Sequence, residues 1–192
     1  MGRDKALLPF GGEPLITRIA RRLAPVAAEV VVVANRPEPY LRLGFRVVPD
    51  PLGLEGEGPL AGLLAGMRAA TRESCLLVAC DMPFASPCLA RLLLAPLQEG
   101  WEAALPAPGG REHPLFAAYR RALAPDVAAA LAAGVRRPLD FLAGRRLRRL
   151  EEAEIAACGS PGLLLANVNR PEEYRQALEE AGETEEAGGT GS

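Results

Sequence analysis

The chain is poor in several polar residue types that often take part in catalysis. Its 192 residues include one lysine and one histidine, against 21 arginines and 19 glutamates. Aspartates and asparagines are also few: Asp4, Asp50, Asp81, Asp126, Asp140, Asn35, Asn167 and Asn169. Arginine replaces lysine readily at a surface, but not where a compact point charge is needed. The scarce residues are therefore candidates for chemistry, although chance survival explains any single one of them equally well.

Other absences exclude whole protein classes. The net charge of −2 gives no electrostatic support for binding nucleic acid. No apolar run approaches the roughly 20 residues of a membrane span, and Gly11, Gly12 and Glu13 interrupt what could otherwise be a signal peptide. We therefore expect a soluble cytoplasmic protein with neither a nucleic-acid nor a membrane partner. We expect one domain over residues 1–182, and an acidic, glycine-rich, disordered tail over residues 183–192.

The four cysteines form no Cys-x-x-Cys pair, and three of them lie in apolar segments. They are Cys75, Cys80, Cys88 and Cys158. This pattern favours buried, reduced thiols over a zinc site or a disulfide framework.

Short apolar runs alternate with helical patterns along the chain. Continuously apolar stretches bounded by turn residues are typical of buried parallel strands. Strands are expected over Glu29–Ala34, Phe45–Val48, Leu76–Cys80, Ala103–Pro106, Leu115–Tyr119, Leu147–Glu151 and Leu163–Ala166. Helices are expected over Pro14–Leu23, Pro59–Ala70, Ser86–Gln98, Pro125–Ala133 and Pro138–Leu142, and from Pro171 onward. The alternation predicts an α/β fold with a doubly wound, mostly parallel sheet.

Most of the scarce polar residues follow predicted strands directly. Asn35, Asp50, Asp81, Asn167 and Asn169 each come just after an apolar run. Ligands of open α/β sheets bind outside the carboxyl ends of the strands. The sequence therefore predicts a site for a phosphate, a metal and a polar small molecule at this edge.

Two motifs, one around Lys5 and one around Asp81, indicate phosphate chemistry. In MGRDKALL, Lys5 can follow a migrating phosphate as a point charge. In LLVACDMPF, Asp81 stands at the end of a buried strand, where a carboxylate can hold Mg²⁺ against phosphate oxygens. The alternative for Lys5 is an ordinary basic terminus. The alternative for Asp81 is a helix or turn cap, which is the weaker interpretation because Ser86 already supplies the cap.

The other candidates are ambiguous. Asn35 and Asp50 suit either ligand contact or a turn, and the small residues of GPLAGLLAGM suit either an anion or close helix packing. Asn167 and Asn169 favour ligand contact modestly. His113 is best explained as a structural residue. The arginine-rich stretch 136–149 is best explained as a solvated face.

Five motifs, in this order, resemble the molybdenum cofactor guanylyltransferases of the Rossmann-like nucleotidyltransferase superfamily. They are MGRDKALLPFGGEPLI, VVPD, GPLAGLLAGM, CDMP and ANVNRPEEY. The resemblance implies that Lys5 binds the GTP phosphates, and that Asp81 binds Mg²⁺ and the nucleotide. It places Asn35 and Asp50 at the guanosine, and Asn167 and Asn169 on the pterin side. The implied reaction is attack by the molybdopterin phosphate on the α-phosphate of GTP, which releases pyrophosphate.

Members of this family begin with a buried strand and a glycine-rich loop ahead of the segment that matches Met1. About 15 residues would make up that strand and loop. Their absence is expected to leave Glu29–Ala34 and Leu76–Cys80 without a common neighbour, and to impair stability and catalysis.

Two other functions remain open. A cytidylyltransferase acting on the same pterin or on a sugar or polyol phosphate would share Lys5 and Asp81, and a non-catalytic module would bind molybdoenzyme partners without turnover.

Overall fold

The computed structural model describes residues 4–10, 12–170, 172–173, 175–176 and 179. Its strands are β1 (Pro9–Phe10), β2 (Glu13–Pro14), β3 (Val31–Val33), β4 (Arg46–Val48), β5 (Ser74–Val78), β6 (Ala103–Pro106), β7 (Phe116–Arg120) and β8 (Leu147–Leu150). Its α-helices are α1 (Leu15–Leu23), α2 (Glu38–Leu41), α3 (Pro59–Ala69), α4 (Pro87–Gln98), α5 (Ala124–Ala132), α6 (Pro138–Leu142), α7 (Glu152–Ala156) and α8 (Pro161–Leu164). Short 3₁₀ helices are η1 (Lys5–Leu7), η2 (Pro108–Gly110) and η3 (Arg121–Leu123).

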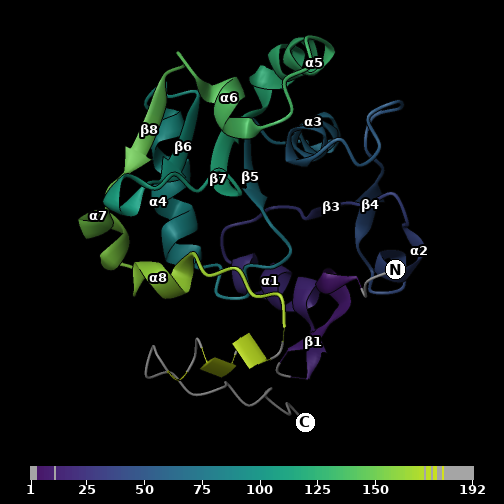
Figure 1. The fold of residues 1–192 in the computed structure, drawn as a ribbon, viewed down its shortest axis with the longest axis vertical. Helices are drawn as coiled ribbons and strands as arrows, with labels where there is room; N and C mark the ends of the chain where they lie inside the picture. The colour runs from purple at the N-terminus through teal and green to yellow at the C-terminus, as the bar shows by residue number, and fades with distance from the viewer. Residues whose placement is uncertain (1–3, 11, 171, 174, 177–178, 180–192) are drawn as a thin grey trace.

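The strands form separate sheets, which Figure 1 shows side by side. The larger sheet has the order β5-β7-β6-β8, and β3 pairs with β4 in a parallel ribbon. Strand β7 is antiparallel to both of its neighbours, whereas β6 and β8 are parallel. The predicted α/β class is confirmed, with a mixed larger sheet.

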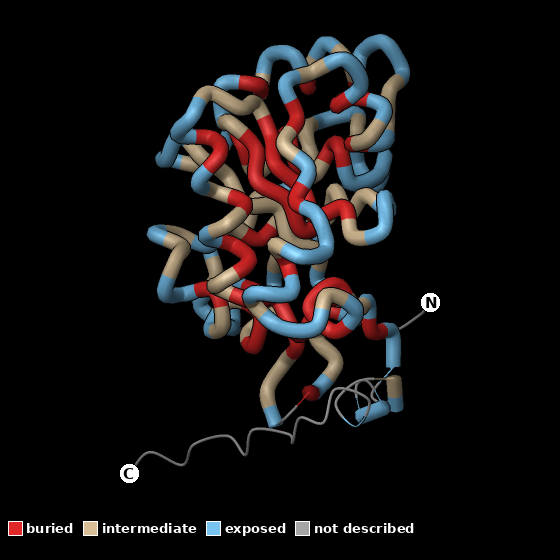
Figure 2. Tube along the Cα trace, turned by 90° about the vertical axis from the view of Figure 1, so that its left-hand side faces the viewer, coloured by how far each residue is buried: buried red, intermediate tan, exposed pale blue. Residues whose placement is uncertain are grey.

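The larger sheet is covered on both faces, which explains the burial of its two central strands, β6 and β7. Along β7, Phe116 and Ala118 belong to the apolar cluster that includes residues of α1 and α4. Ala117 and Tyr119 belong to the cluster on the opposite face, with residues of α3, α5 and α6. This alternation follows the two-residue period of a strand. The buried segments accordingly gather in the middle of the molecule (Figure 2).

One expected strand is a helix. The expectation of a strand over Leu163–Ala166 is wrong, because Pro161–Leu164 forms α8. Proline is favoured at the first position of a helix, and Leu164 N–H donates to the Ser160 carbonyl over 2.9 Å. A short apolar run carries too little periodicity to separate a strand from a buried helical turn. The helix expected from Pro171, and the tail expected over 183–192, lie partly or wholly outside the described residues.

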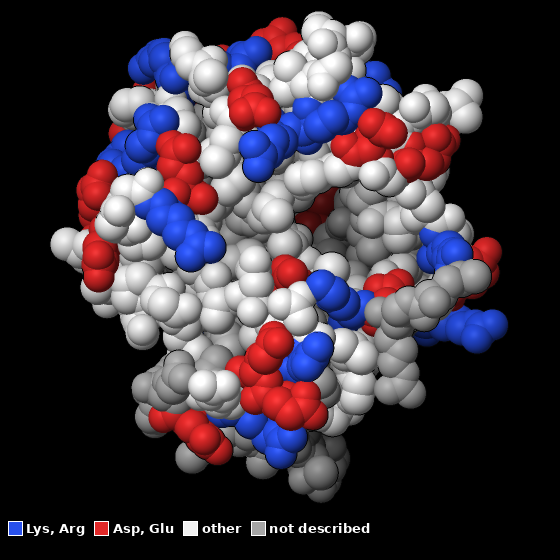
Figure 3. Space-filling view, viewed as in Figure 1, with Lys and Arg blue, Asp and Glu red and all other residues white. Residues whose placement is uncertain are grey.

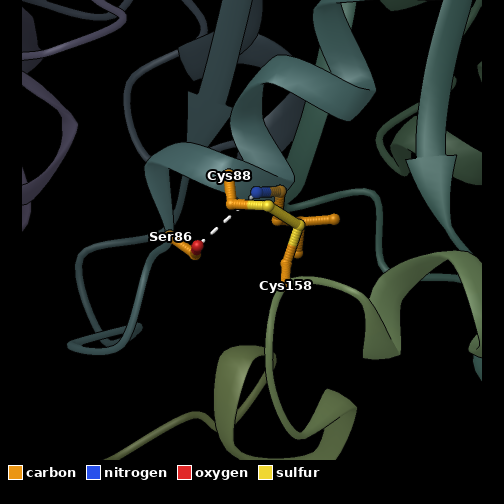
Figure 4. The surroundings of a disulfide bond; sticks show 4 residues. Ser86, Cys88 and Cys158 are labelled. Carbon is orange, nitrogen blue, oxygen red and sulfur yellow. Dashed lines mark hydrogen bonds between the residues drawn. A yellow bond between two sulfur atoms is a disulfide. The ribbon is translucent and has the colours of Figure 1, made fainter.

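A disulfide joins Cys88 to Cys158 (Figure 4). The expectation of four reduced thiols is therefore wrong for this pair. Cys88 stands in the first turn of α4 and Cys158 just after α7, with their Cα atoms 5.5 Å apart. Their separation of 70 residues hides the contact from any spacing rule. Cys75 and Cys80 are free, and burial raises the pKa of both thiols.

No helix in the described part of the chain combines the length and the apolar character that a membrane span requires.

Candidate active site

Lys5 is presented by a short, tightly held turn. It opens the 3₁₀ helix η1, whose N-cap is Asp4. One carboxylate oxygen of Asp4 accepts from Ala6 N–H over 3.2 Å, and the other accepts from the Tyr40 hydroxyl over 2.7 Å. Burial, and then the Asp4 bond, raise the pKa of Tyr40, so its hydroxyl stays protonated as the donor. The scaffold of Lys5 therefore includes a buried tyrosine from α2 that the sequence did not point to.

The other end of the chain reaches Lys5. The Lys5 ammonium donates to the side-chain oxygen of Asn169 over 2.5 Å, and both residues are exposed. Asn169 is itself held by its backbone N–H, which donates to Glu173 over 2.7 Å. The two predicted site residues, 164 positions apart, thus share one hydrogen bond.

Asp81 lies in the same neighbourhood, at the end of the chain segment that leaves β5. Its carbonyl accepts from Val168 N–H over 2.7 Å, which fixes the asparagine segment to the Asp81 turn. Arg22 of α1 braces the same turn by donating to the Ala85 carbonyl over 3.1 Å. Met82 and Phe84 anchor the turn in the core.

One carboxylate oxygen of Asp81 is buried and has no hydrogen-bond partner among the described residues. A buried acceptor without a partner is unusual, because its desolvation is not compensated. A cation or a ligand donor would satisfy it. The described residues contain no group of three or more histidine, cysteine or acidic side chains that could hold a metal. One carboxylate completed by phosphate oxygens and water is, however, a usual magnesium environment. Asp81 therefore fits Mg²⁺ brought in with a nucleotide.

Asn35 and Asp50 are paired with each other. The Asn35 amide donates to Asp50 over 2.9 Å, and Asp50 N–H donates back to the Asn35 side chain over 3.0 Å. Gly56 N–H also donates to Asp50 over 3.0 Å. The pair joins the carboxyl ends of β3 and β4, so its structural role is established and its contact with guanosine stays a prediction. In α3, a Cβ added at Gly62 would lie 4.0 Å from an Asp50 carboxylate oxygen, which is an ordinary van der Waals distance, so both interpretations of GPLAGLLAGM stay predictions.

Asn167 faces a different hollow from Asn169. A cavity of about 520 Å³ is lined by Asn167 together with Arg111 and His113. Burial, and then Arg111, lower the pKa of His113. The structure therefore divides the predicted asparagine pair, with one member at Lys5 and the other in this second cavity.

The arginine-rich stretch is used for surface ion pairs. Arg136 pairs with Glu57 at 2.7 Å, and Arg148 pairs with Glu154 at 2.6 Å. Arg145 contacts both Glu102 and Asp126 at 3.1 Å. Figure 3 shows blue and red side chains interspersed over the same face. These pairs agree with the expectation of a solvated face.

A family model described as MobA-like NTP transferase domain matches residues 1–154. The probable molybdenum cofactor guanylyltransferase of Pelotomaculum thermopropionicum is 38% identical over 177 residues, covering 92% of this chain and 85% of that protein. The molybdenum cofactor guanylyltransferase of Rhizobium meliloti is also 38% identical, over 185 residues, covering 92% and 84%.

Solved structures show a similar fold. Molybdopterin-guanine dinucleotide biosynthesis protein A from Archaeoglobus fulgidus gives a TM-score of 0.75 at 24% identity, covering 94% of this chain and 92% of that one. The 2-C-methyl-D-erythritol 4-phosphate cytidylyltransferase of Thermus thermophilus gives 0.65 at 22% identity, covering 92% and 93%. At these identities the structural likeness supports the fold and not the choice of nucleotide.

Proposed function

The chain belongs to the MobA-like NTP transferase family, and from this premise we propose that it transfers GMP from GTP to the phosphate of molybdopterin. A phosphate oxygen of the pterin attacks the α-phosphorus of GTP. The bond from that phosphorus to the bridging oxygen of the β-phosphate breaks, and pyrophosphate leaves. The observation that carries the proposal is the convergence of Lys5, Asn169 and the unsatisfied Asp81 carboxylate at the ends of distant segments.

Lys5 binds and orients the phosphates in this proposal. Its exposed ammonium has three donors, and its hydrogen-bond partner in the structure is the neutral side-chain oxygen of Asn169. Exchange of the neutral Asn169 oxygen for a charged phosphate oxygen gives a stronger, charge-assisted bond. Asn169 then becomes available to the second substrate, which places the pterin side next to the phosphates.

Asp81 is the group that would hold Mg²⁺. The ion, when bound, neutralises charge on the phosphate oxygens and thereby lowers the barrier to attack. The protein's own contribution is placement, because nucleotidyl transfer needs alignment and charge stabilisation more than covalent help. The Val168 and Arg22 hydrogen bonds hold the Asp81 turn in position before substrate arrives. Asn35 and Asp50 would contact the guanosine, and Asn167 the pterin side.

Nucleotide choice is the direct test of this proposal. We expect Mg²⁺–GTP at about 100 times its dissociation constant to add roughly 2.7 kcal/mol of stability, or about 5–10 °C in Tm for a chain of this length, and Mg²⁺–CTP to add far less. Product formation with molybdopterin should show the same preference, measured as pyrophosphate release and as dinucleotide mass.

Preference for CTP in both assays would contradict the guanylyl assignment and favour a cytidylyltransferase. Nucleotide binding without any product, at saturating molybdopterin and Mg²⁺, would favour a non-catalytic binding module instead. Omitting Mg²⁺ tests the metal requirement in the same experiment.

Tyr40→Phe tests whether the support of the Lys5 turn matters. Loss of the hydroxyl removes one of the two bonds that hold Asp4, so Lys5 is less well placed for phosphate. We expect GTP affinity to fall by about tenfold, the value of one hydrogen bond to a charged group. Calorimetric titration measures this change. The matched control is Tyr119→Phe, which removes a 2.8 Å bond to the Pro114 carbonyl within the core. Equal losses of affinity in both variants would show that the effect is merely a loss of stability.

A further inference from the structure

The cavity that Asn167 lines is built from segments far apart in the sequence, and we call it the second cavity. Its volume of about 520 Å³ lies within the usual range of small-ligand sites. One wall is the loop of η2 between β6 and β7, and the other consists of residues of α7, α8 and the segment that follows them. Figure 1 shows α7 and α8 following the end of β8, at one end of the larger sheet.

Two opposite charges line the second cavity without pairing. Arg111 comes from the η2 wall and Glu152 from α7, and both are exposed. In the described part of the chain, no hydrogen bond or ion pair involves either side chain. By contrast, the neighbouring Glu112 pairs with Arg149 at 2.6 Å. A guanidinium and a carboxylate that share a cavity and do not meet leave room between them for a ligand with an acceptor on one side and donors on the other.

The wall that carries Arg111 is held by main-chain hydrogen bonds. Arg111 N–H donates to the Pro108 carbonyl over 3.1 Å, and His113 N–H donates to the Pro106 carbonyl over 2.9 Å. The turn between them requires a positive φ of 81° at Gly110. Burial, and then Arg111, lower the pKa of His113, so its imidazole is neutral near pH 7 and brings no second positive charge to the cavity.

On the opposite wall, α7 leaves Glu152 available. Glu151 caps the helix, and its N–H donates back to the Glu154 side chain over 2.9 Å in a capping box. Glu154 also pairs with Arg148 at 2.6 Å. Two glutamates of this segment therefore serve the helix itself, whereas the carboxylate of Glu152 has no such role and lies at the cavity.

The charges of the second cavity favour a neutral, flat ligand over a phosphate. A carboxylate on the wall repels an anion, and here it balances the one guanidinium. The 2-amino-4-oxo edge of a pterin ring is neutral and carries two N–H donors beside a carbonyl oxygen. A carboxylate accepts from both N–H groups, while a guanidinium donates to the carbonyl. Apolar lining residues, among them Pro108, Pro161 and Leu165, suit the faces of such a ring.

Three consecutive residues join the second cavity to the phosphate site. Asn167 lines the cavity, and Val168 N–H donates to the Asp81 carbonyl over 2.7 Å. Asn169 then accepts from the Lys5 ammonium. Cα atoms two positions apart are separated by at most roughly 7 Å. A single phosphorylated pterin can therefore place its ring in the second cavity and its phosphate beside Lys5 and Asp81.

We propose that Glu152 and Arg111 recognise the 2-amino-4-oxo edge of the pterin and thereby select the second substrate. Glu152 accepts from the ring N3–H and the 2-amino group, and Arg111 donates to the carbonyl oxygen O4. The inference rests on the proposed transferase function, which supplies a pterin as the substrate. Guanine has the same edge, but its predicted contact, Asp50, lines a different cavity of about 660 Å³ between β3 and β5. The second cavity is thus left to the pterin.

Binding of two ring compounds to the whole chain tests the proposal. 6-Hydroxymethylpterin carries the proposed edge. 6-Hydroxymethyllumazine has a carbonyl oxygen in place of the 2-amino group, which sets an acceptor against the Glu152 carboxylate. We expect the pterin to bind at least about tenfold more tightly in a fluorescence titration, because one donor to a charged acceptor is lost in the lumazine. Guanosine should not displace the pterin.

Variants of the two charged residues locate the recognition. Glu152→Gln should lower pterin affinity by about 10- to 100-fold and abolish the preference over lumazine, because it replaces an acceptor by a mixed donor and acceptor. Arg111→Gln should lower pterin affinity by about tenfold. The matched controls are Glu154→Gln and Arg149→Gln, whose side chains form ion pairs and do not line the second cavity. Both controls should bind the pterin like the unmodified chain.

The transfer reaction gives a separate readout. Glu152→Gln and Arg111→Gln should raise KM for molybdopterin by the same factors and leave kcat and KM for GTP within about twofold, because contacts remote from the reacting phosphorus are equal in the ground and transition states.

Several results would overturn the proposal: no pterin binding at millimolar concentration, displacement of the pterin by guanosine, or unchanged pterin preference in a folded Glu152→Gln variant. Transferase activity with an unchanged KM for molybdopterin in both variants would refute this inference alone. Selective pterin binding that depends on Glu152, in a chain without transferase activity, would support the inference and refute the proposed reaction.

Discussion

Asp81→Asn is expected to lower kcat by about 100- to 1,000-fold, the usual effect of removing one group that stabilises transition-state charge. Asparagine keeps the size and shape of the side chain but removes the negative charge. The buried oxygen that lacks a partner in the structure is then no longer a carboxylate, and its affinity for Mg²⁺ falls. Pyrophosphate release at saturating GTP and molybdopterin measures the effect. A higher concentration of Mg²⁺ should recover part of the lost rate.

Asp140→Asn is the matched control, because Asp140 is exposed on α6, which lies well apart from α1 in Figure 1. Its kcat should equal that of the unmodified chain. Thermal melts of both variants separate a catalytic effect from misfolding. Nearly normal turnover by a folded Asp81→Asn variant would refute the assignment of Asp81 as the metal-holding group.

Reduction of the Cys88–Cys158 disulfide is expected to remove about 4 kcal/mol from the free energy of unfolding. The bond closes a loop across 70 residues, and the loss of loop-closure entropy in the unfolded chain predicts that value. For a domain of this size the change corresponds to a fall of about 8–16 °C in Tm. Melts with and without a phosphine reductant measure it.

The bond also lies close to the candidate site in the sequence. Cys158 precedes α8 and the segment of Asn167 and Asn169, and Cys88 stands in the first turn of α4, the helix that follows the Asp81 turn. Reduction should therefore weaken GTP binding as well as the fold. The double variant Cys88→Ala, Cys158→Ala is the control, because its Tm should be low and insensitive to reductant. Four titratable thiols in the denatured, unreduced chain, rather than two, would contradict the presence of the bond.

The local features of the fold could be derived from the sequence. Ala103–Pro106 and Pro138–Leu142 have the bounds that their patterns predict, and Ser86 caps α4 as expected, accepting from Leu89 N–H. These features depend on apolar runs, turn residues and capping chemistry that act over a few positions. The failures arose where distant segments decide the outcome. The antiparallel direction of β7 and the helical conformation of Leu163 depend on the elements that pack against them. The composition of these two segments does not determine either feature.

By itself, the sequence determined the α/β class, most of the elements and the identity of the scarce residues Lys5, Asp81 and Asn169. Only the tertiary structure decided which of them meet: Lys5 with Asn169, Asn35 with Asp50, and Asp4 with Tyr40. It also decided the disulfide and the apolar cavity of about 660 Å³ between β3 and β5. The physical reason is that periodicity and capping are properties of neighbouring residues, whereas these contacts join positions brought together only when the whole chain packs.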